Sequence, residues 1–196
     1  MNNVEYLRGD MASKNPREQM GEIFADGYYE WLKYFSKDKG KLAKAFAYIF
    51  KLEHFYLAVA DDDEILAFTA CTDGKEPSIT LDKNELRKEL GMISGTIAYR
   101  MLCKHLLGQS YPFALSPETG SIEFVATKEK HRGKGIAKGL ITFIMAQTIY
   151  DEYVLEVASS NTSAIKLYDK LGFREFKKIP APKKSGFDYY VYMKTI

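Results

Sequence analysis

The chain has 196 residues, which is enough for one well-packed domain and short for two. Hydrophobic residues make up 46% and charged residues 28% of it, a composition typical of soluble globular proteins. The net charge is only +2, with 28 Lys and Arg against 26 Asp and Glu, so the chain lacks the basic excess of nucleic-acid-binding proteins.

Nothing in the sequence predicts export, membrane insertion or a metal site. The first ten residues, MNNVEYLRGD, do not form a charged-then-apolar signal, and no apolar run approaches the 18 or so residues of a spanning helix. Cys71 and Cys103 lie in apolar surroundings without metal-ligand spacing, and the three histidines are scattered. We therefore expect reduced thiols, a cytoplasmic location and no metal.

The first third of the chain predicts helices followed by a hairpin. Residues 4–7 form a short candidate strand. Apolar residues recur at spacings of three and four over 16–35, which indicates one amphipathic helix, and again over 42–50, which indicates a second. Residues 54–60 and 65–72 predict two strands joined by a short acidic turn.

The middle of the chain predicts one more helix and then a strong strand. Apolar spacing predicts a helix over residues 86–101, although Gly91 and Gly95 weaken it. The segment SIEFVAT, residues 121–127, then predicts a buried strand.

The last third predicts alternating helices and strands. A glycine-containing loop leads into a helix that begins near Lys134, and residues 152–158 form the next strand. Residues 161–172 predict a helix with Asn161 at its N-cap and Gly172 at its end. Two closing strands are expected at about 173–178 and 188–194.

This order of elements predicts one domain over residues 1–196 with a mixed α/β fold of the α+β type. The sheet should be mostly antiparallel and flanked by helices. Residues 123–157 form a strand-helix-strand crossover, so its two strands should be parallel and adjacent.

The loop HRGKGIA, residues 131–137, places glycines next to cations, a pattern that often binds phosphate. It is not a P-loop, because no glycine is followed by Lys and then Ser or Thr. It does not fit the dinucleotide fingerprint either, because Lys138 occupies the third glycine position. The remaining pattern is Arg132-x-x-Gly135-x-Ala137, which opens a helix directly after a strand.

This loop resembles the Gln/Arg-x-x-Gly-x-Gly/Ala signature of the GNAT superfamily, the acyl-CoA-dependent N-acyltransferases. A second segment at the expected distance, EVASSNTSAIKLYDKLGF (residues 156–173), is similar to the second conserved block of that family. The resemblance covers residues 119–176 and is looser over the hairpin. It implies an N-acetyltransferase that moves an acetyl group from acetyl-CoA to a primary amine by direct attack in a ternary complex, without a metal.

The resemblance also implies where acetyl-CoA binds. Free amides and the dipole at the helix start suit the diphosphate, while the pantetheine arm lies beside the strand, where the family's two parallel strands splay apart. Asn161 is expected to bond a pantetheine amide, to cap its helix, or both, and Lys138 to bind phosphate or to be solvated. The matching positions are Val125, Ala126, Thr127, Arg132, Gly133, Lys134, Gly135, Ile136, Ala137, Lys138 and Asn161.

Two residues are candidates for the chemistry. Glu123 is the expected base or acceptor ligand, and regular alternation along the strand would place it on the same face as Val125 and Thr127. Its alternative is a glutamate in solvent. Tyr168 matches the family's tyrosine that protonates the leaving thiolate, and its alternative is a packing tyrosine.

The acceptor stays open at this level: a small molecule, a peptide or a protein amine would each fit, with no nucleic acid or membrane as partner. Residues 83–117 are longer than the family's usual connection. We read them as a helical insertion before the central strand that covers the acceptor cleft or forms a homodimer contact. The alternative function is a CoA- or acyl-CoA-binding sensor of the same fold without catalysis.

Overall fold

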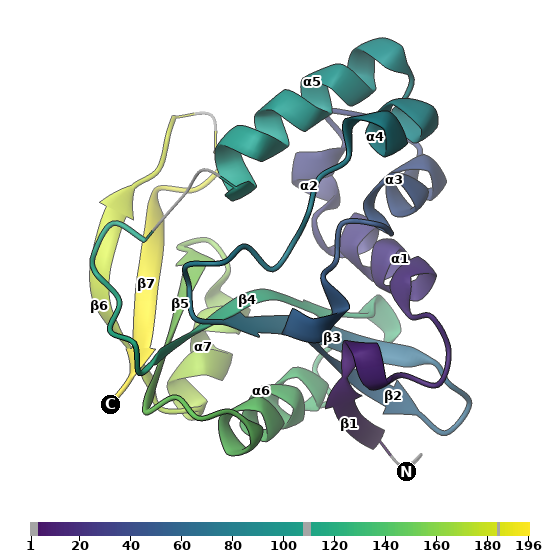
Figure 1. Ribbon diagram of the computed structural model, residues 1–196. Coiled ribbons are helices and arrows are strands. Elements are labelled where there is room, and N and C mark those ends of the chain that lie inside the picture. Colours follow the sequence, from purple (N-terminus) through teal and green to yellow (C-terminus); the bar gives the residue numbers. More distant parts are fainter. Residues whose placement is uncertain (1–3, 108–110, 184) are drawn as a thin grey trace.

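A seven-stranded sheet organises the chain (Figure 1), and the computed structural model describes residues 4–107, 111–183 and 185–196. The strand order is β1-β2-β3-β4-β5-β7-β6. Every neighbouring pair is antiparallel except β4 and β5, which are parallel and adjacent as predicted. The strands are β1 (Val4–Arg8), β2 (Phe55–Ala60), β3 (Ile65–Thr72), β4 (Thr119–Thr127), β5 (Glu152–Ala158), β6 (Phe173–Pro180) and β7 (Tyr189–Thr195).

Helices cover both faces of the sheet (Figure 1). One face carries α6 (Ile136–Gln147) and α7 (Thr162–Lys170), and we call it the α6 face. The other, the α1 face, carries α1 (Arg17–Gly27), α2 (Tyr29–Leu32), α3 (Lys39–Phe46), α4 (Lys83–Leu90) and α5 (Met92–Leu102). A separate hydrophobic core fills each side, so the predicted mixed fold with a mostly antiparallel sheet is confirmed.

The predicted single helix over residues 16–35 is wrong, because α1 ends at Gly27 and a short α2 follows. Glycine favours the helix less than every residue except proline, so a break at Gly27 costs little. Residues from both halves, including Phe24 and Leu32, are nevertheless buried in the same core. The second predicted helix also stops early, at Phe46, and the buried Phe50 beyond it pairs with Ile79 in an isolated bridge.

The predicted helix over residues 86–101 is likewise two helices, α4 and α5. Gly91 separates them with φ 88° and ψ 162°, a conformation that L-residues with a side chain rarely adopt. Gly95 has a different role, since a Cβ there would lie 2.5 Å from the Cα of Arg87, so α5 crosses α4 closely at this point. Residues 108–110 of the expected insertion lie outside the described residues.

Gly21 tests the packing of α1 on α3. A Cβ at this position would lie 2.4 Å from the backbone oxygen of Ala43, so Gly21→Ala should lower the free energy of unfolding by about 1–3 kcal/mol in urea titrations. Gly27→Ala is the matched control, because no atom lies within 4 Å of its added Cβ, and it should leave stability unchanged or raise it by up to about 1 kcal/mol. Equal stability of the two variants would contradict this packing.

Candidate active site

The parallel strands β4 and β5 pair over only part of their length. Their paired residues run from Thr119 opposite Glu152 to Ile122 opposite Leu155. Beyond Ile122, β4 continues beside β3 as far as Thr127, while β5 continues beside β7. The splay implied by the family resemblance is therefore present, and it leaves backbone groups of β4 without a partner strand on that side.

A β-bulge in β4 changes which way its side chains point. Phe124 has φ 52°, and the register with β3 shifts at this point. Glu123 lies opposite Ala70, whose side chain is in the α1-face core, whereas Val125 packs into the α6-face core. The predicted common face for Glu123, Val125 and Thr127 is therefore wrong, because the extra residue of the bulge interrupts the alternation.

Three hydroxyl groups hold the carboxylate of Glu123. Thr72 Oγ1 and Ser121 Oγ each donate to Glu123 Oε1 at 2.9 Å, and Ser78 Oγ donates to Oε2 at 2.6 Å. Glu123 is half-buried, so it is not a glutamate in open solvent. The hydroxyls fill three of the roughly four acceptor positions of a carboxylate, which leaves one for a substrate proton.

A second carboxylate on the same face was missed by the sequence analysis. Glu156 lies on β5 between Leu155 and Val157, both of which pack into the α6-face core, so Glu156 points to the α1 face. Desolvation by neighbouring protein raises its pKa, which a hydrogen bond from Tyr192 partly offsets, although the residue remains exposed. The available signal was an acid inside the segment EYVLEVA, where apolar residues flank Glu156 on both sides.

We call the place where β4 and β5 stop pairing the split. Tyr168 lies on the side of the split opposite to Glu123. Its side chain is buried in the α6-face core, with its ring 6.0 Å from that of Phe173, and burial raises its pKa to about 12. The phenol is therefore protonated at neutral pH and can donate a proton. Burial also raises the pKa of Tyr28, which packs against the α1-face core.

The start of α6 fits a diphosphate. Gly139 N–H donates to Gly135 O at 3.0 Å and closes the first turn, so the N–H groups of Ile136, Ala137 and Lys138 have no intrahelical acceptor. Gly135 and Gly133 have φ 80° and 74°, and a Cβ on either would meet no atom within 4 Å. Free donors beside open space are what the oxygens of a diphosphate require.

The other residues of the predicted loop are placed around this helix start. Arg132 Nε donates to Thr127 O at 3.2 Å, which ties the loop to the end of β4. Lys134 and Lys138 are exposed, as phosphate ligands or solvated lysines would be. Ala126 is buried in the α1-face core, so it has only backbone groups to offer a ligand.

Glu64 anchors this loop and was not predicted. Its carboxylate, on the turn between β2 and β3, lies 2.6 Å from Lys128 Nζ, 2.6 Å from Lys130 Nζ and 3.4 Å from His131 Nε2. Hydrogen bonds from the two lysines lower its pKa to about 2. The hairpin therefore fixes the segment that connects β4 to α6.

Asn161 forms the N-cap that the sequence left open. Its Oδ1 accepts from Ala164 N–H at 3.2 Å and from Ser163 Oγ at 3.1 Å. The side-chain amide still has its own N–H groups to donate. The contact with pantetheine stays a prediction.

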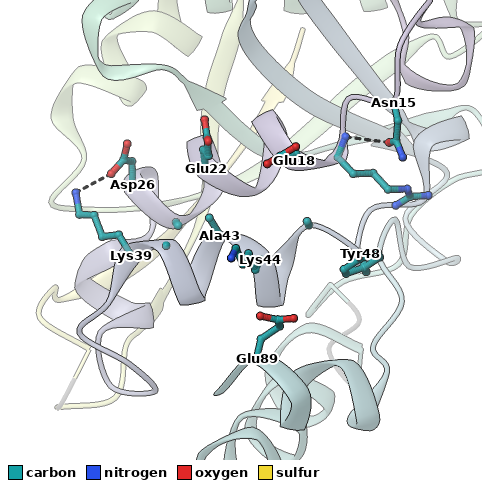
Figure 2. A pocket seen from close by; sticks show the side chains of 13 residues that line it. Asn15, Glu18, Glu22, Asp26, Lys39, Ala43, Lys44, Tyr48 and Glu89 are labelled. Atoms are coloured by element: carbon teal, nitrogen blue, oxygen red, sulfur yellow. Dashed lines mark hydrogen bonds and ion pairs between the residues drawn. The ribbon is translucent and has the colours of Figure 1, made fainter. Parts of the chain in front are cut away.

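A groove of about 660 Å³ lies elsewhere, between α1 and α3 (Figure 2). Acidic residues of α1 face lysines of α3 across it, and Asp26 pairs with Lys39 at 2.6 Å. None of the predicted site residues is among those that line it. The candidate site is therefore marked by strand geometry and not by this groove.

The part of the chain that the structure describes has neither a cluster of metal ligands nor a membrane-spanning helix. Within residues 4–107, 111–183 and 185–196, no group of three or more His, Cys, Asp or Glu side chains could hold a metal ion. No helix in the same ranges is long and apolar enough to cross a membrane.

Comparison with known sequences gives one family. Residues 17–173 match the family described as Acetyltransferase (GNAT) family. The chain is also similar to N-alpha-acetyltransferase 30 of Xenopus laevis, with 37% identity over 75 residues. That match covers 37% of this chain and 25% of the frog protein, so the chain spans well under two thirds of that relative.

Solved structures resemble the whole chain. An N-acetyltransferase from Staphylococcus aureus Mu50 has a TM-score of 0.64 at 17% identity, covering 97% of this chain and 100% of the other. A structure described as the NatC complex bound to Gag peptide and CoA has a TM-score of 0.55 at 16% identity, covering 98% of each chain. At these identities the likeness shows the fold alone.

Gly135 tests the helix start as a diphosphate site. Gly135→Ala places a side chain at φ 80° beside the free amides, so calorimetry should show coenzyme A binding weakened at least about tenfold, together with about 1 kcal/mol of lost stability. Gly172→Ala is the matched control, because Gly172 has φ 92°, equally open space, and lies at the end of α7. It should lose similar stability and keep its affinity, and equal affinity of both variants would contradict the assignment.

Glu64 gives a prediction about acid stability. Because its pKa in the folded protein lies below the ordinary 4.5, its carboxylate stabilises the fold above that pH, and the effect is lost as pH falls toward 2. The free energy of unfolding of Glu64→Gln should therefore be about 1–2 kcal/mol lower than that of the parent at pH 7, with the difference vanishing near pH 2. Glu30→Gln, in an exposed pair with Lys33, should change stability by less than about 0.5 kcal/mol. A difference that stays constant down to pH 2 would contradict the ionic anchor.

Proposed function

Because this chain belongs to the GNAT acetyltransferase family, we propose that it transfers an acetyl group from acetyl-CoA to the α-amine at the N-terminus of a peptide or protein. The name of the frog relative supports this acceptor class, as does the NatC structure that is described with a peptide and CoA. The observation that carries the proposal is the split between β4 and β5, with carboxylates on one side and a buried phenol on the other.

Acetyl-CoA would bind through backbone groups along the split and at the start of α6. The N–H groups of Ile136, Ala137 and Lys138 would hold the diphosphate, and Gly133 and Gly135 leave room for it. The pantetheine arm would lie where β4 has lost its pairing with β5, adding to the exposed edge as an extra strand. This arrangement presents the thioester to the middle of β4.

The acceptor amine would approach from the α1 face. An α-amine has a pKa near 8, so removing its proton at neutral pH costs only about 1 kcal/mol, against roughly 4–5 kcal/mol for a lysine side chain. Glu123 accepts this proton at its remaining lone pair, and Glu156 supplies a second negative charge that attracts the ammonium group. The acidic side of the split therefore suits a group that arrives as a cation.

The bond changes then follow from the two faces of the split. The neutral amine nitrogen attacks the thioester carbon, and backbone N–H groups at the bulge of β4 stabilise the charge that develops on the carbonyl oxygen. The nitrogen then gives up its second proton to solvent water as the C–S bond breaks. Tyr168 donates its phenolic proton to the departing thiolate and is reprotonated from solvent. The acid and the base thus work from opposite sides without competing for one proton.

A thiol-release assay tests this function. Peptides with a free N-terminus should release coenzyme A from acetyl-CoA, whereas the same peptides with a blocked N-terminus and an internal lysine, or a polyamine, should react at least about tenfold more slowly. Glu123→Gln should lower kcat at pH 7 about five- to tenfold, because deprotonating the α-amine without the base costs about 1 kcal/mol, with the calorimetric Kd for coenzyme A within twofold of the parent.

Two results would decide against the proposal. If the blocked lysine peptide or the polyamine reacts faster than peptides with a free N-terminus, the acceptor is a side-chain amine or a small amine and not an α-amine. Coenzyme A binding without release by any amine would identify a sensor of the same fold instead of an enzyme.

A further inference from the structure

The chain that returns from α5 is fastened over the outer strands of the sheet on the α1 face. Lys177 Nζ on β6 donates to Pro112 O at 2.9 Å and lies 5.6 Å from the ring centre of Phe113. The Phe113 ring in turn lies 4.9 Å from Phe176 and 5.4 Å from Tyr192. Residues 111–115, which we call the return segment, thus pack beside the strand that pairs with Glu156.

The first residue of the return segment reaches the candidate base through one intermediary. Tyr111 OH lies 2.7 Å from Ser121 Oγ, and Ser121 Oγ donates to Glu123 Oε1 at 2.9 Å. A serine hydroxyl has a single proton, and here that proton is given to the carboxylate. Tyr111 must therefore be the donor in its bond with Ser121, so the chain runs in one direction, from phenol to serine to glutamate.

Packing holds the Tyr111 ring in this orientation. Its ring centre lies 6.1 Å from that of Tyr192. Gly74 leaves the room that the segment needs, because a Cβ there would lie 2.3 Å from Leu115 Cδ1 and 3.6 Å from the Tyr111 ring. Burial raises the pKa of Tyr111, so its hydroxyl remains a donor over the whole neutral range.

We infer that Tyr111 is a positioning residue for the reaction, which fixes Ser121 and through it the carboxylate of Glu123. The inference rests on the proposed function, since it assigns a task to the same base. The return segment, which leads from α5 to β4, thereby becomes part of the site. It supplies a hydroxyl to the network that orients the proton acceptor, Glu123. The ring alone would serve packing, whereas the hydroxyl serves the base.

The test removes hydroxyls and keeps the rings. Tyr111→Phe should lower kcat about three- to tenfold, the effect of one well-placed hydrogen bond, with KM for acetyl-CoA within twofold of the parent. Ser121→Ala should lower kcat at least as much, and the double variant should equal Ser121→Ala, because both act along one chain. Tyr153→Phe is the matched control, since its buried hydroxyl bonds Thr148, and it should keep the parent kcat.

The outcomes separate this inference from the proposed function. If Glu123→Gln is impaired while Tyr111→Phe equals the parent, or if the losses at Tyr111 and Ser121 add, the inference is overturned and the function stands. If no amine is acetylated, the function fails. Urea unfolding of the parent, Tyr111→Phe, Ser121→Ala and the double variant then decides whether Tyr111 acts through Ser121. Tyr111→Phe should then destabilise the parent but not the Ser121→Ala variant, and equal losses in both backgrounds would overturn it.

Discussion

Everything proposed for this protein depends on the point at which β4 and β5 stop pairing. Two adjacent parallel strands normally share hydrogen bonds along their length, because an unpaired buried backbone group is costly. Here the pairing ends at Ile122 and Leu155, and each strand keeps only its outer neighbour. The unpaired edge of β4 is thereby available to a ligand whose amides can replace the missing strand.

The two faces of the split differ in chemistry because each is built by different elements. On the α1 face, Glu123 and Glu156 come from the two strands themselves, and hydroxyls from β3 and the segments beside it orient Glu123. On the α6 face, α7 places Tyr168 in an apolar core that keeps its phenol protonated. A reaction that takes a proton on one side and returns one on the other needs this separation.

Local patterns were enough to predict much of this arrangement. The hairpin, the crossover from β4 through α6 to β5, the N-cap at Asn161 and the glycines at the start of α6 all follow from short segments whose neighbours in space are also neighbours in sequence. The sequence indicated Gly91 as a weak point within one helix but did not predict that it separates two helices, because glycine tolerates both a helix and a bend.

The remaining features depend on contacts between distant segments. Glu64 meets Lys128 across 64 positions of sequence, and Ser78 meets Glu123 across 45, which no local spacing indicates. The bulge at Phe124 reversed a face assignment because alternation assumes an uninterrupted strand. Glu156 could have been predicted, since it gives the same signal as Glu123, an acid flanked by apolar residues inside a strand.

The bulge also connects the packing of the aromatic core to the width of the split. Phe124 carries an aromatic side chain on a left-handed backbone, a conformation that costs about 1–3 kcal/mol. Its ring lies 6.1 Å from that of Phe24 and 6.3 Å from that of Phe55, so neighbouring rings hold the residue in that conformation. Loss of these ring contacts would remove the packing that offsets this cost. The aromatic core on the α1 face thus supports the bulge that lies where β4 and β5 separate.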